Sequence, residues 1–351
     1  MPSMPLKPSM DTEKLIATAK AMVAPGKGIL AIDESFPTNK KRFEAVGVEV
    51  TEENRRLYRQ LLVSTPGISD AISGYILFDE TIRQKTDDGV PFPEVLRGEG
   101  ILPGIKVDGG TVLLALHPEE KVTEGLDGLR DRLREYASLG AAFTKWRAVY
   151  KIESNLPSEA CFKANAHALA RYGALAQEAG LVPMVEPEIL YDGDHSIERC
   201  ADVSARALDV LFAELKEQGV LLEGTILKTS MVLAGKENAK QSTPEEVAAA
   251  TVAMFKKHVP ASLAGIVFLS GGQSEKQSTE NLNAMHQLGE DLPWPISFSY
   301  GRGIQNPALE IWAKDMSAVE AAQKALVHRA KANGLAAEGK YTEAFEEDRG
   351  Y

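Results

Sequence analysis

The chain has 351 residues, of which 44% are hydrophobic, enough to bury the core of two ordinary domains or of one large α/β barrel. Its formal net charge of −11 at pH 7 argues against a general nucleic-acid or membrane-surface binder, because phosphate groups would be repelled by most of its surface. An anionic ligand would therefore have to meet a local basic pocket.

The start of the chain predicts no export and no membrane anchor. The first ten residues, MPSMPLKPSM, are proline-rich and lack the hydrophobic stretch of a secretory signal, and nowhere do eighteen apolar residues follow one another. Cys161 and Cys200 lie in separate helix-like segments and form no CxxC pair, which favours a reducing compartment. We expect a soluble, cytoplasmic protein in which residues 1–24 form an N-terminal arm and first helix.

Short β-rich segments recur along the chain, with helical segments between most of them. They cover residues 28–33, 73–78, 102–107, 141–146, 181–188, 224–229, 265–272 and 295–301. Strands that alternate with helices predict a parallel sheet, and the number of strands indicates one closed (β/α)8 TIM barrel. An open doubly wound sheet is the alternative, but no strand is followed by a GxGxxG turn.

The helices between these strands show their own boundaries. Gly140, Gly180 and Gly219 each stand directly before an apolar run, and each is predicted to end a helix. Before Gly219, apolar residues recur at i, i+3, i+4 and i+7 from Leu208, the pattern of a helix packed on a sheet. Thr243, followed by proline and two glutamates, is predicted to cap the start of another helix.

Several predicted strands are apolar at first and polar at their carboxyl ends, where the active sites of barrels lie. The polar residues there are Asp33, Lys106, Lys145, Arg147, Glu186, Glu188, Lys228, Ser270 and Arg302. A single charge at a strand end is often only the start of a solvated loop, but three lysines gathered with three carboxylates indicate a site. A structural ion-pair network would gather the same groups and stays an alternative.

Lys228 lies in the otherwise apolar stretch LEGTILKTSMVLAG. An amine in a cationic, partly dehydrated pocket is partly neutral and therefore nucleophilic. With Lys145 and Lys106 as candidate cationic neighbours, Lys228 fits a lysine that forms a Schiff base with a ketone. Glu186 fits the group that transfers the protons which this reaction requires.

The loops after the last two strands, LSGGQS and YGRG, predict a phosphate site. Loops at these positions of a barrel often bind phosphate through backbone N–H groups, which glycine allows to come close. Arg302 would add a charge-assisted fork to the same anion.

These strand ends resemble those of class I fructose-1,6-bisphosphate aldolase, in the order GILAIDES, TEENRR, ILFDETIRQKTDDG, GIKVD, KWR, VEPEIL, LEGTILK, FLSGGQS and FSYGR. The resemblance implies a barrel over residues 25–338 with a C-terminal helical extension and a tail over residues 339–351. It also implies a homotetrameric lyase of glycolysis and gluconeogenesis. Such an enzyme reversibly cleaves fructose 1,6-bisphosphate to dihydroxyacetone phosphate and glyceraldehyde 3-phosphate, with no cofactor and no metal.

The resemblance also implies roles for single residues. Lys228 is similar to the Schiff-base lysine, Glu186 to the acid/base that serves it, and Asp33 to the residue that takes the C4 hydroxyl proton. Lys145 would polarise and position the substrate, and Glu188 would balance the charge of the lysines.

The phosphate groups of the substrate are assigned from the same motifs. The C1-phosphate candidates are Ser270, Gly271, Gly272, Gly301 and Arg302, and the C6-phosphate candidates are Ser35, Thr38, Lys106 and Arg147. Arg42 resembles a basic residue at the mouth, and Arg55 is either a ligand or structural.

The chain departs from the family at three places. Thr229 and Ser230 follow the lysine where animal members have Pro-Asn, and DESFPTNKKR differs from the common DESTGS loop. The last segment is short but ends in Tyr351, which in the family can assist proton transfer; a frayed terminus is the alternative.

Other functions remain as alternatives. A zinc aldolase needs histidine ligands, but the six histidines form no HxxxH or HxH pair, and DGDHS at residues 192–196 is more typical of a turn. Another Schiff-base sugar-phosphate lyase would differ mainly in its phosphate sites. A non-catalytic barrel scaffold would not need Asp33, Lys145, Glu186 and Lys228 together.

Overall fold

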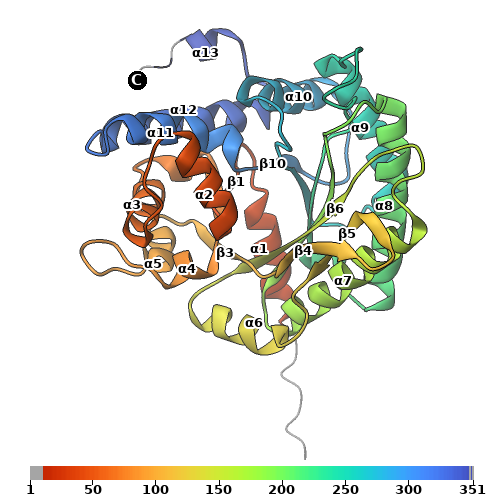
Figure 1. Ribbon diagram of the computed structural model, residues 1–351, viewed down its shortest axis with the longest axis horizontal. Helices are drawn as coiled ribbons and strands as arrows, with labels where there is room; N and C mark the ends of the chain where they lie inside the picture. The colour runs from red at the N-terminus through yellow and green to blue at the C-terminus, as the bar shows by residue number, and fades with distance from the viewer. Residues whose placement is uncertain (1–10, 348, 350–351) are drawn as a thin grey trace, which may run out of the picture.

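In the computed structural model, which describes residues 11–347 and 349, eight parallel strands close into a barrel (Figure 1). They are β1 (Gly28–Ala31), β2 (Ile72–Leu77), β3 (Leu102–Lys106), β6 (Phe143–Tyr150), β7 (Val182–Ile189), β8 (Ile226–Thr229), β9 (Gly265–Phe268) and β10 (Ile296–Tyr300). β1 pairs with both β2 and β10, which completes the ring. The predicted (β/α)8 barrel is therefore confirmed, strand by strand.

The helices lie around the barrel, and most of them cover the outward faces of its strands (Figure 1). They are α1 (Thr12–Met22), α2 (Phe36–Ala45), α3 (Glu52–Val63), α4 (Asp79–Arg83), α5 (Phe92–Gly98), α6 (Leu129–Ser138), α7 (Glu159–Glu178), α8 (Ile197–Glu217), α9 (Pro244–His258), α10 (Glu275–Gln287), α11 (Arg302–Lys314), α12 (Val319–Ala336) and α13 (Ala344–Glu347), with short 3-10 turns at Ile68–Asp70 and Leu222–Gly224. Within the described residues, every helix is too short or too polar to cross a bilayer.

The predicted helix ends are confirmed. Gly140, Gly180 and Gly219 follow α6, α7 and α8 with φ of +96°, +76° and +70°. After α7, for example, the N–H of Gly180 donates to the Gln177 carbonyl and the next N–H reaches back to Ala176, both at 3.0 Å. This pairing satisfies carbonyl groups that the end of a helix leaves open, and it turns the chain directly into the next strand. Thr243 forms a reciprocal capping box with the glutamate at the third position of α9.

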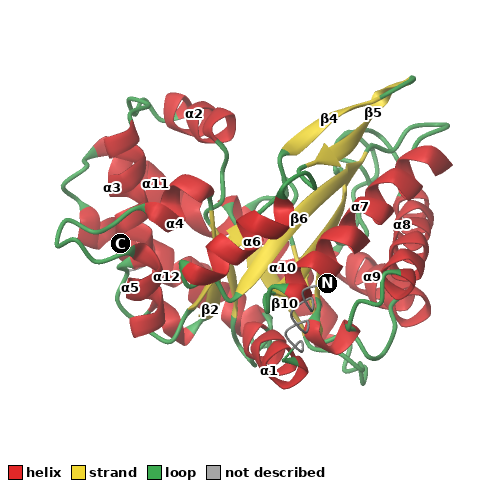
Figure 2. Cartoon of the chain, turned by 90° about the horizontal axis from the view of Figure 1, so that it is seen from below, coloured by secondary structure: helices red, strands yellow, loops and turns green. Residues whose placement is uncertain are grey.

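The amino-terminal half of the barrel interior is apolar and is closed by α1. Figure 1 shows α1 in the middle of the ring, and Figure 2 places it at the end of the barrel opposite α2. This inner cluster contains Leu15, Ala19, Met22 and Val23 around α1, and Ile29, Ala31, Ile76, Phe143, Val182, Met184, Ile226 and Val267 from the strands.

The side chains that point into the barrel change from apolar to charged towards the carboxyl ends of the strands. Side chains alternate along a strand, so the next inward positions after Ala31, Phe143, Met184 and Ile226 are two residues further on. Those positions hold Asp33, Lys145, Glu186 and Lys228. The same alternation that fills the lower half of the barrel therefore aims the charged groups into its upper half.

The outward residues between these positions pack beneath the helices. Trp146, between Lys145 and Arg147 in β6, has no exposed surface and stacks on Tyr172 of α7 with ring centroids 5.5 Å apart. Burial of a large apolar side chain stabilises a fold by about 1.5–3 kcal/mol. A rotation of β6 that pointed Lys145 outward would remove Trp146 from its contact with Tyr172 and turn its ring towards the charged groups in the barrel, so packing fixes the direction of the lysine.

One element was not predicted from the sequence, an antiparallel hairpin between β3 and α6. It is formed by β4 (Gly110–Leu114) and β5 (His117–Glu124) and lies outside the barrel. β5 reads HPEEKVTE, whose charged residues are poor strand formers. Figure 2 shows the hairpin projecting from the same end of the molecule as α2, which is the end where the charged rows lie.

The packing inside the barrel leads to a stability prediction for Gly104 of β3. A Cβ atom at this position would lie 2.2 Å from the ring of Phe143, which is buried in the inner cluster and has no free space to move into. Gly104→Ala should therefore lower the free energy of unfolding by about 1–3 kcal/mol, measured by urea denaturation.

Gly98→Ala is the matched control, because a Cβ atom at the end of α5 would meet nothing within 4 Å. The φ angle of Gly98 is also not positive, so an alanine can adopt it. It should leave the stability unchanged or slightly increased. Equal unfolding midpoints for the two variants would contradict the packing argument.

Candidate active site

Four of the predicted residues meet in the upper half of the barrel, and we call them the charge quartet: Asp33, Lys145, Glu186 and Lys228. The Nζ atom of Lys145 lies 2.6 Å from Asp33 Oδ2 and 3.2 Å from Glu186 Oε2. The Nζ atom of Lys228 lies 3.3 Å from Glu186 Oε1. The two ammonium groups and two carboxylates thus alternate in a line from β1 through β6 and β7 to β8.

The quartet is almost dry. Lys145, Glu186 and Lys228 are only 4%, 3% and 4% exposed. Charges removed from water are costly unless they are paired, and each member of the quartet has an oppositely charged neighbour within the group. Its formal charge sums to zero, so the barrel holds four buried charges without a net charge.

The electrostatics keep the acids ionised. Burial by itself would raise the pKa of Asp33, but the Lys145 and Lys228 ammonium groups outweigh it and lower this pKa to about 2. Burial also opposes ionisation of Glu186, yet the same two lysines lower its pKa. For Lys145, burial favours the neutral amine, but Asp33 and Glu186 prevail and raise its pKa.

Glu186 has spare capacity to accept a proton. Although Lys145 is within ion-pair distance, Glu186 Oε2 is buried and accepts no hydrogen bond from any residue that the structure describes. A buried oxygen with an unused lone pair is uncommon in native proteins and is often found where a catalytic group works.

A second set of charged pairs lies around the quartet. Lys106 at the end of β3 pairs with Asp108, which also accepts the backbone N–H of Arg147 at 3.2 Å. The Arg147 guanidinium in turn pairs with Glu188. Glu188 therefore neutralises an arginine, and the ion pairs differ from the expectation that it balances the lysines.

The segment after β1 carries the next candidates. Ser35 stands at the N-cap position of α2, and its Oγ atom lies 3.3 Å from the Thr38 hydroxyl. Arg42 pairs with Glu34 and also donates to the Gln305 side chain of α11 at 3.1 Å. This contact ties α2 to α11, the helix that follows the last barrel strand.

Arg55 of α3 is firmly held on the outer side of this segment. It forms two hydrogen bonds to Glu80, at 2.8 and 2.6 Å, and its guanidinium lies 4.9 Å from the centre of the Phe36 ring. A bidentate pair of this kind fixes an arginine strongly. The partners Glu34, Glu80, Asp108 and Gln305 were not identified from the sequence. Glu34 and Asp108 each follow directly after a predicted strand, and that position is a signal that could have revealed them.

The two glycine-rich loops that were predicted to bind phosphate lie after β9 and β10. Gly271 and Gly272 follow Ser270 with φ of +58° and +97°, a conformation that glycine adopts easily. Gly301 is the N-cap of α11, so the positive end of this helix dipole lies beside the same loops. Arg302 is exposed, and no carboxylate in the described part of the chain pairs with it.

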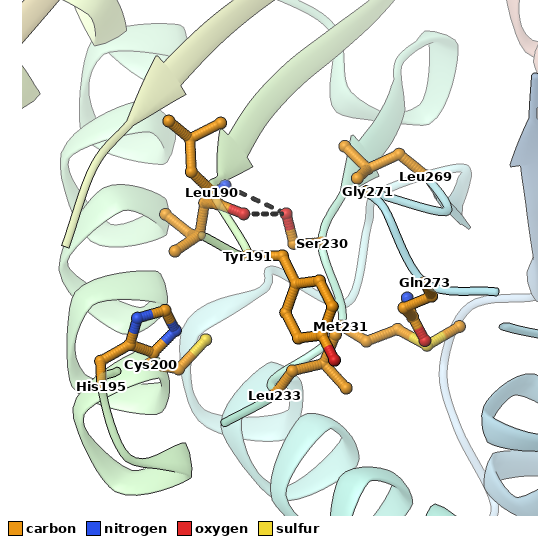
Figure 3. Close-up of a pocket in the computed structure, with 11 residues that line it drawn as sticks. Leu190, Tyr191, His195, Cys200, Ser230, Met231, Leu233, Leu269, Gly271 and Gln273 are labelled. Carbon is orange, nitrogen blue, oxygen red and sulfur yellow. Dashed lines mark hydrogen bonds between the residues drawn. The ribbon is translucent and has the colours of Figure 1, made fainter. Parts of the chain in front are cut away.

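A small cavity lies behind these loops (Figure 3). It is lined by Ser230, Gly271 and the buried ring of His195, among others, and its volume is about 10 Å³. This is about the space of one water molecule and is too small for a sugar phosphate.

Other sequence-based candidates are not part of this constellation. Tyr351 lies outside the described residues. Within residues 11–347 and 349, no group of three or more His, Cys, Asp or Glu side chains is placed to hold a metal ion. Cys161 and Cys200 are free, buried thiols in α7 and α8.

Comparison with known proteins gives one consistent result. The family model for fructose-bisphosphate aldolase class-I matches residues 14–350. The probable fructose-bisphosphate aldolase class 1 of Xanthomonas campestris pv. campestris is 62% identical over 333 residues, covering 95% of this chain and 99% of the relative. Fructose-bisphosphate aldolase 6, cytosolic, of Arabidopsis thaliana is 51% identical and covers 94% and 92%.

A solved structure has the same fold as this chain along nearly its whole length. It is fructose-bisphosphate aldolase from Plasmodium falciparum, in complex with TRAP and a small-molecule inhibitor. The TM-score is 0.93 at 47% sequence identity, with 97% of this chain and 99% of the other covered.

The charge quartet predicts a pH-dependent effect of removing Lys145. In the native protein, Asp33 has a pKa of about 2 against an ordinary value of 3.8, so its stabilising contribution is present above pH 3.8 and is lost as the pH falls towards 2. In Lys145→Met, burial would dominate and raise the pKa of the acids, which then cost stability as the pH rises through that pKa. The stability gap between wild type and Lys145→Met should therefore widen from pH 4 to pH 7, measured by urea unfolding.

Lys151→Met is the control for this measurement. Lys151 also meets two carboxylates, Glu119 and Glu153, but it lies on the surface. Ion pairs on the surface are screened by water and contribute little to stability, so this variant should lose little stability at any pH. A stability gap for Lys145→Met that stayed constant between pH 4 and pH 7 would contradict the coupling within the quartet.

Proposed function

Because the chain belongs to the class I fructose-bisphosphate aldolase family, it is an aldehyde-lyase that cleaves fructose 1,6-bisphosphate, and we propose that Lys228 forms the Schiff base with the substrate. The observation that supports this role most directly is the contact between Lys228 and Glu186. A buried amine at a strand end lies 3.3 Å from a carboxylate that has an unused acceptor atom. An amine and a proton acceptor at this distance are what imine formation requires.

In the proposed reaction, the Lys228 ammonium gives a proton to Glu186, and the neutral amine attacks C2 of the open-chain ketose. Glu186 returns the proton to the carbinolamine hydroxyl, which leaves as water and yields a protonated imine. Loss of positive charge at Lys228 removes one of the groups that lower the pKa of Glu186. The carboxylate therefore becomes a better base at the moment when it must hold the proton.

Carbon–carbon cleavage is assigned to Asp33 and the imine. Asp33 takes the proton of the C4 hydroxyl while the C3–C4 bond breaks, and the bonding electrons move to the imine nitrogen to form an enamine. Glyceraldehyde 3-phosphate leaves first. Protonation of the enamine at C3 and hydrolysis of the imine then release dihydroxyacetone phosphate. Since the pKa of Asp33 is about 2, this carboxylate is ionised at neutral pH and can accept a proton. A group with so low a pKa is a weak base, so the proton must move in concert with the breaking of the C3–C4 bond.

Lys145 is proposed to act through its fixed positive charge. Its raised pKa keeps it cationic, and it lies between Asp33 and Glu186, the two groups that move protons. A fixed cation beside the C4 oxygen would stabilise the negative charge that develops there as cleavage begins. Glu188 supports this arrangement indirectly, because it holds Arg147 and leaves Lys145 to the two catalytic acids.

The two phosphate sites are proposed to differ in whether their cationic side chains already pair with a carboxylate. Ser270, Gly271, Gly272, Gly301 and Arg302 would hold the C1-phosphate, and Ser35, Thr38, Lys106 and Arg147 would hold the C6-phosphate. Arg42 would approach the ligand at the mouth on the C6 side, and Arg55 would be either a further ligand there or structural. Each cation on the C6 side is already paired with a carboxylate. A C6-phosphate must share these cations, whereas Arg302 has no carboxylate partner among the described residues. The C1-phosphate site should therefore contribute more binding free energy.

The assembly and location of the enzyme are also proposals. We propose a homotetramer, as in the family that the motifs resemble, and a cytoplasmic location, which the cytosolic Arabidopsis relative supports. Sedimentation velocity would test the assembly, and a mass of one subunit at micromolar concentration would rule out the tetramer.

The Schiff-base assignment predicts a covalent adduct on one lysine. Wild type incubated with dihydroxyacetone phosphate and EDTA, then reduced with borohydride, should carry an adduct on Lys228 in peptide mass spectrometry. Lys228→Met should carry no adduct and should lose about 10⁴-fold or more in cleavage rate. Lys151→Met, which removes an exposed lysine, should keep both the adduct and the rate.

Two other results would contradict this assignment. A wild-type protein that forms no adduct and loses cleavage in EDTA would indicate a metal mechanism. A protein that forms no adduct and shows no cleavage would instead be a scaffold.

The difference between the phosphate sites predicts unequal effects of two arginines. Arg302→Met should raise KM about 10- to 100-fold for both fructose 1,6-bisphosphate and fructose 1-phosphate, because a charged hydrogen-bond donor to the C1-phosphate is lost. Arg55→Met should raise KM less, and only for the bisphosphate, since Arg55 is held by Glu80. Steady-state kinetics with both substrates would check this, and a larger effect of Arg55→Met would reverse the assignment.

A further inference from the structure

The backbone pairing between β7 and β8 stops just before the charge quartet. It joins Met184 with Ile226 and Val185 with Leu227, and it goes no further. On the other side of β8, pairing with β9 continues through Lys228 to Thr229. The sequence explains the difference, because Pro187, two residues beyond Val185, has no N–H group with which to continue the ladder.

Two hydroxyl groups join the strands where the ladder is missing. Thr229 Oγ1 donates to the Pro187 carbonyl at 2.9 Å. Ser230 Oγ donates to the Ile189 carbonyl at 2.8 Å and accepts the N–H of the same residue at 3.0 Å (Figure 3). Both side chains are buried, at 4% and 6% exposure, so water does not compete for these bonds.

These hydrogen bonds lie close to Lys228 and Glu186, the two residues that must contact each other. Thr229 and Ser230 follow Lys228 in the chain, and their acceptors on β7 stand on either side of Glu188, just after Glu186. Neither hydroxyl contacts the charge quartet. They hold the ends of two strands, one carrying the amine and the other its proton acceptor, at the separation that gives the 3.3 Å contact.

We propose that Thr229 and Ser230 are positioning residues for Schiff-base formation. Their hydroxyl groups replace the missing backbone hydrogen bonds between β7 and β8, and they thereby hold the Lys228 amine against Glu186. The proposal builds on the role proposed for Lys228.

The test uses nearly isosteric variants and measures the imine step itself. In single-turnover experiments, the full-length enzyme is mixed with dihydroxyacetone phosphate and the imine on Lys228 is trapped with borohydride at successive times. Thr229→Val and Ser230→Ala should each trap about two- to tenfold more slowly, the loss expected from one uncharged hydrogen bond. The double variant should be slower than either. For Thr229→Val, kcat should fall while KM stays about the same.

Thr229→Ser is the conservative variant, and Thr225→Val is the matched control. Thr229→Ser keeps the hydroxyl and should restore the wild-type rate. Thr225 is a fully buried threonine directly before the first residue of the same strand, where its hydroxyl donates to the Leu221 carbonyl at 2.8 Å. Thr225→Val should cost stability but leave the trapping rate unchanged, which separates a general loss of stability from a loss of positioning.

The outcomes are distinct. Slower trapping in Thr229→Val and Ser230→Ala, with rescue by Thr229→Ser, supports the proposal. Wild-type trapping rates in both variants, or an equal slowing in Thr225→Val, would overturn the positioning role while the Schiff base on Lys228 stands. Absence of any adduct on wild-type Lys228 would overturn the proposed function and this inference with it.

Discussion

The upper half of the barrel depends on one interaction, the alternation of positive and negative charge along the charge quartet. None of its four members would be stable alone in so dry a place, because an unpaired buried charge costs several kcal/mol. Together they lower the pKa of both acids and raise that of Lys145. Because both acids are ionised and Lys145 is cationic before any substrate arrives, the groups proposed to move protons are already in place.

The rest of the fold holds the quartet in place from below and from outside. α1 and the inner apolar cluster fill the lower half of the barrel, so the charged groups have no space into which they could sink. Outward residues such as Trp146 are buried beneath the helices and fix the rotation of each strand. The stiffness of a close-packed core therefore sets the distances between groups that come from four separate strands.

The same arrangement makes the two proposed phosphate sites different. On one side of the mouth, glycine-rich loops and a helix terminus offer N–H groups, and Arg302 has no described carboxylate partner. On the other side, every candidate cation is neutralised by an acid. A substrate with two phosphate groups would be held firmly at one end and would exchange ion-pair partners at the other.

The sequence by itself determined the strands of the barrel, the ends of several helices and the alternation of side chains along each strand. Strand alternation, the glycines at 140, 180 and 219 and the cap at Thr243 are local signals, because they depend on residues that are close in the chain. They were enough to predict the barrel and to bring Asp33, Lys145, Glu186 and Lys228 to one end of it.

Only the tertiary structure decided which charge pairs with which. Arg42 contacts Gln305 across the closure of the barrel, Glu188 pairs with Arg147 and not with a lysine, and β5 forms a hairpin despite its charged residues. The ladder between β7 and β8 ends early, and two hydroxyls replace it. These outcomes follow from the register and packing of distant strands, which no local pattern of residue types encodes, since the energy of an ion pair or hydrogen bond depends on differences of about an ångström between atoms.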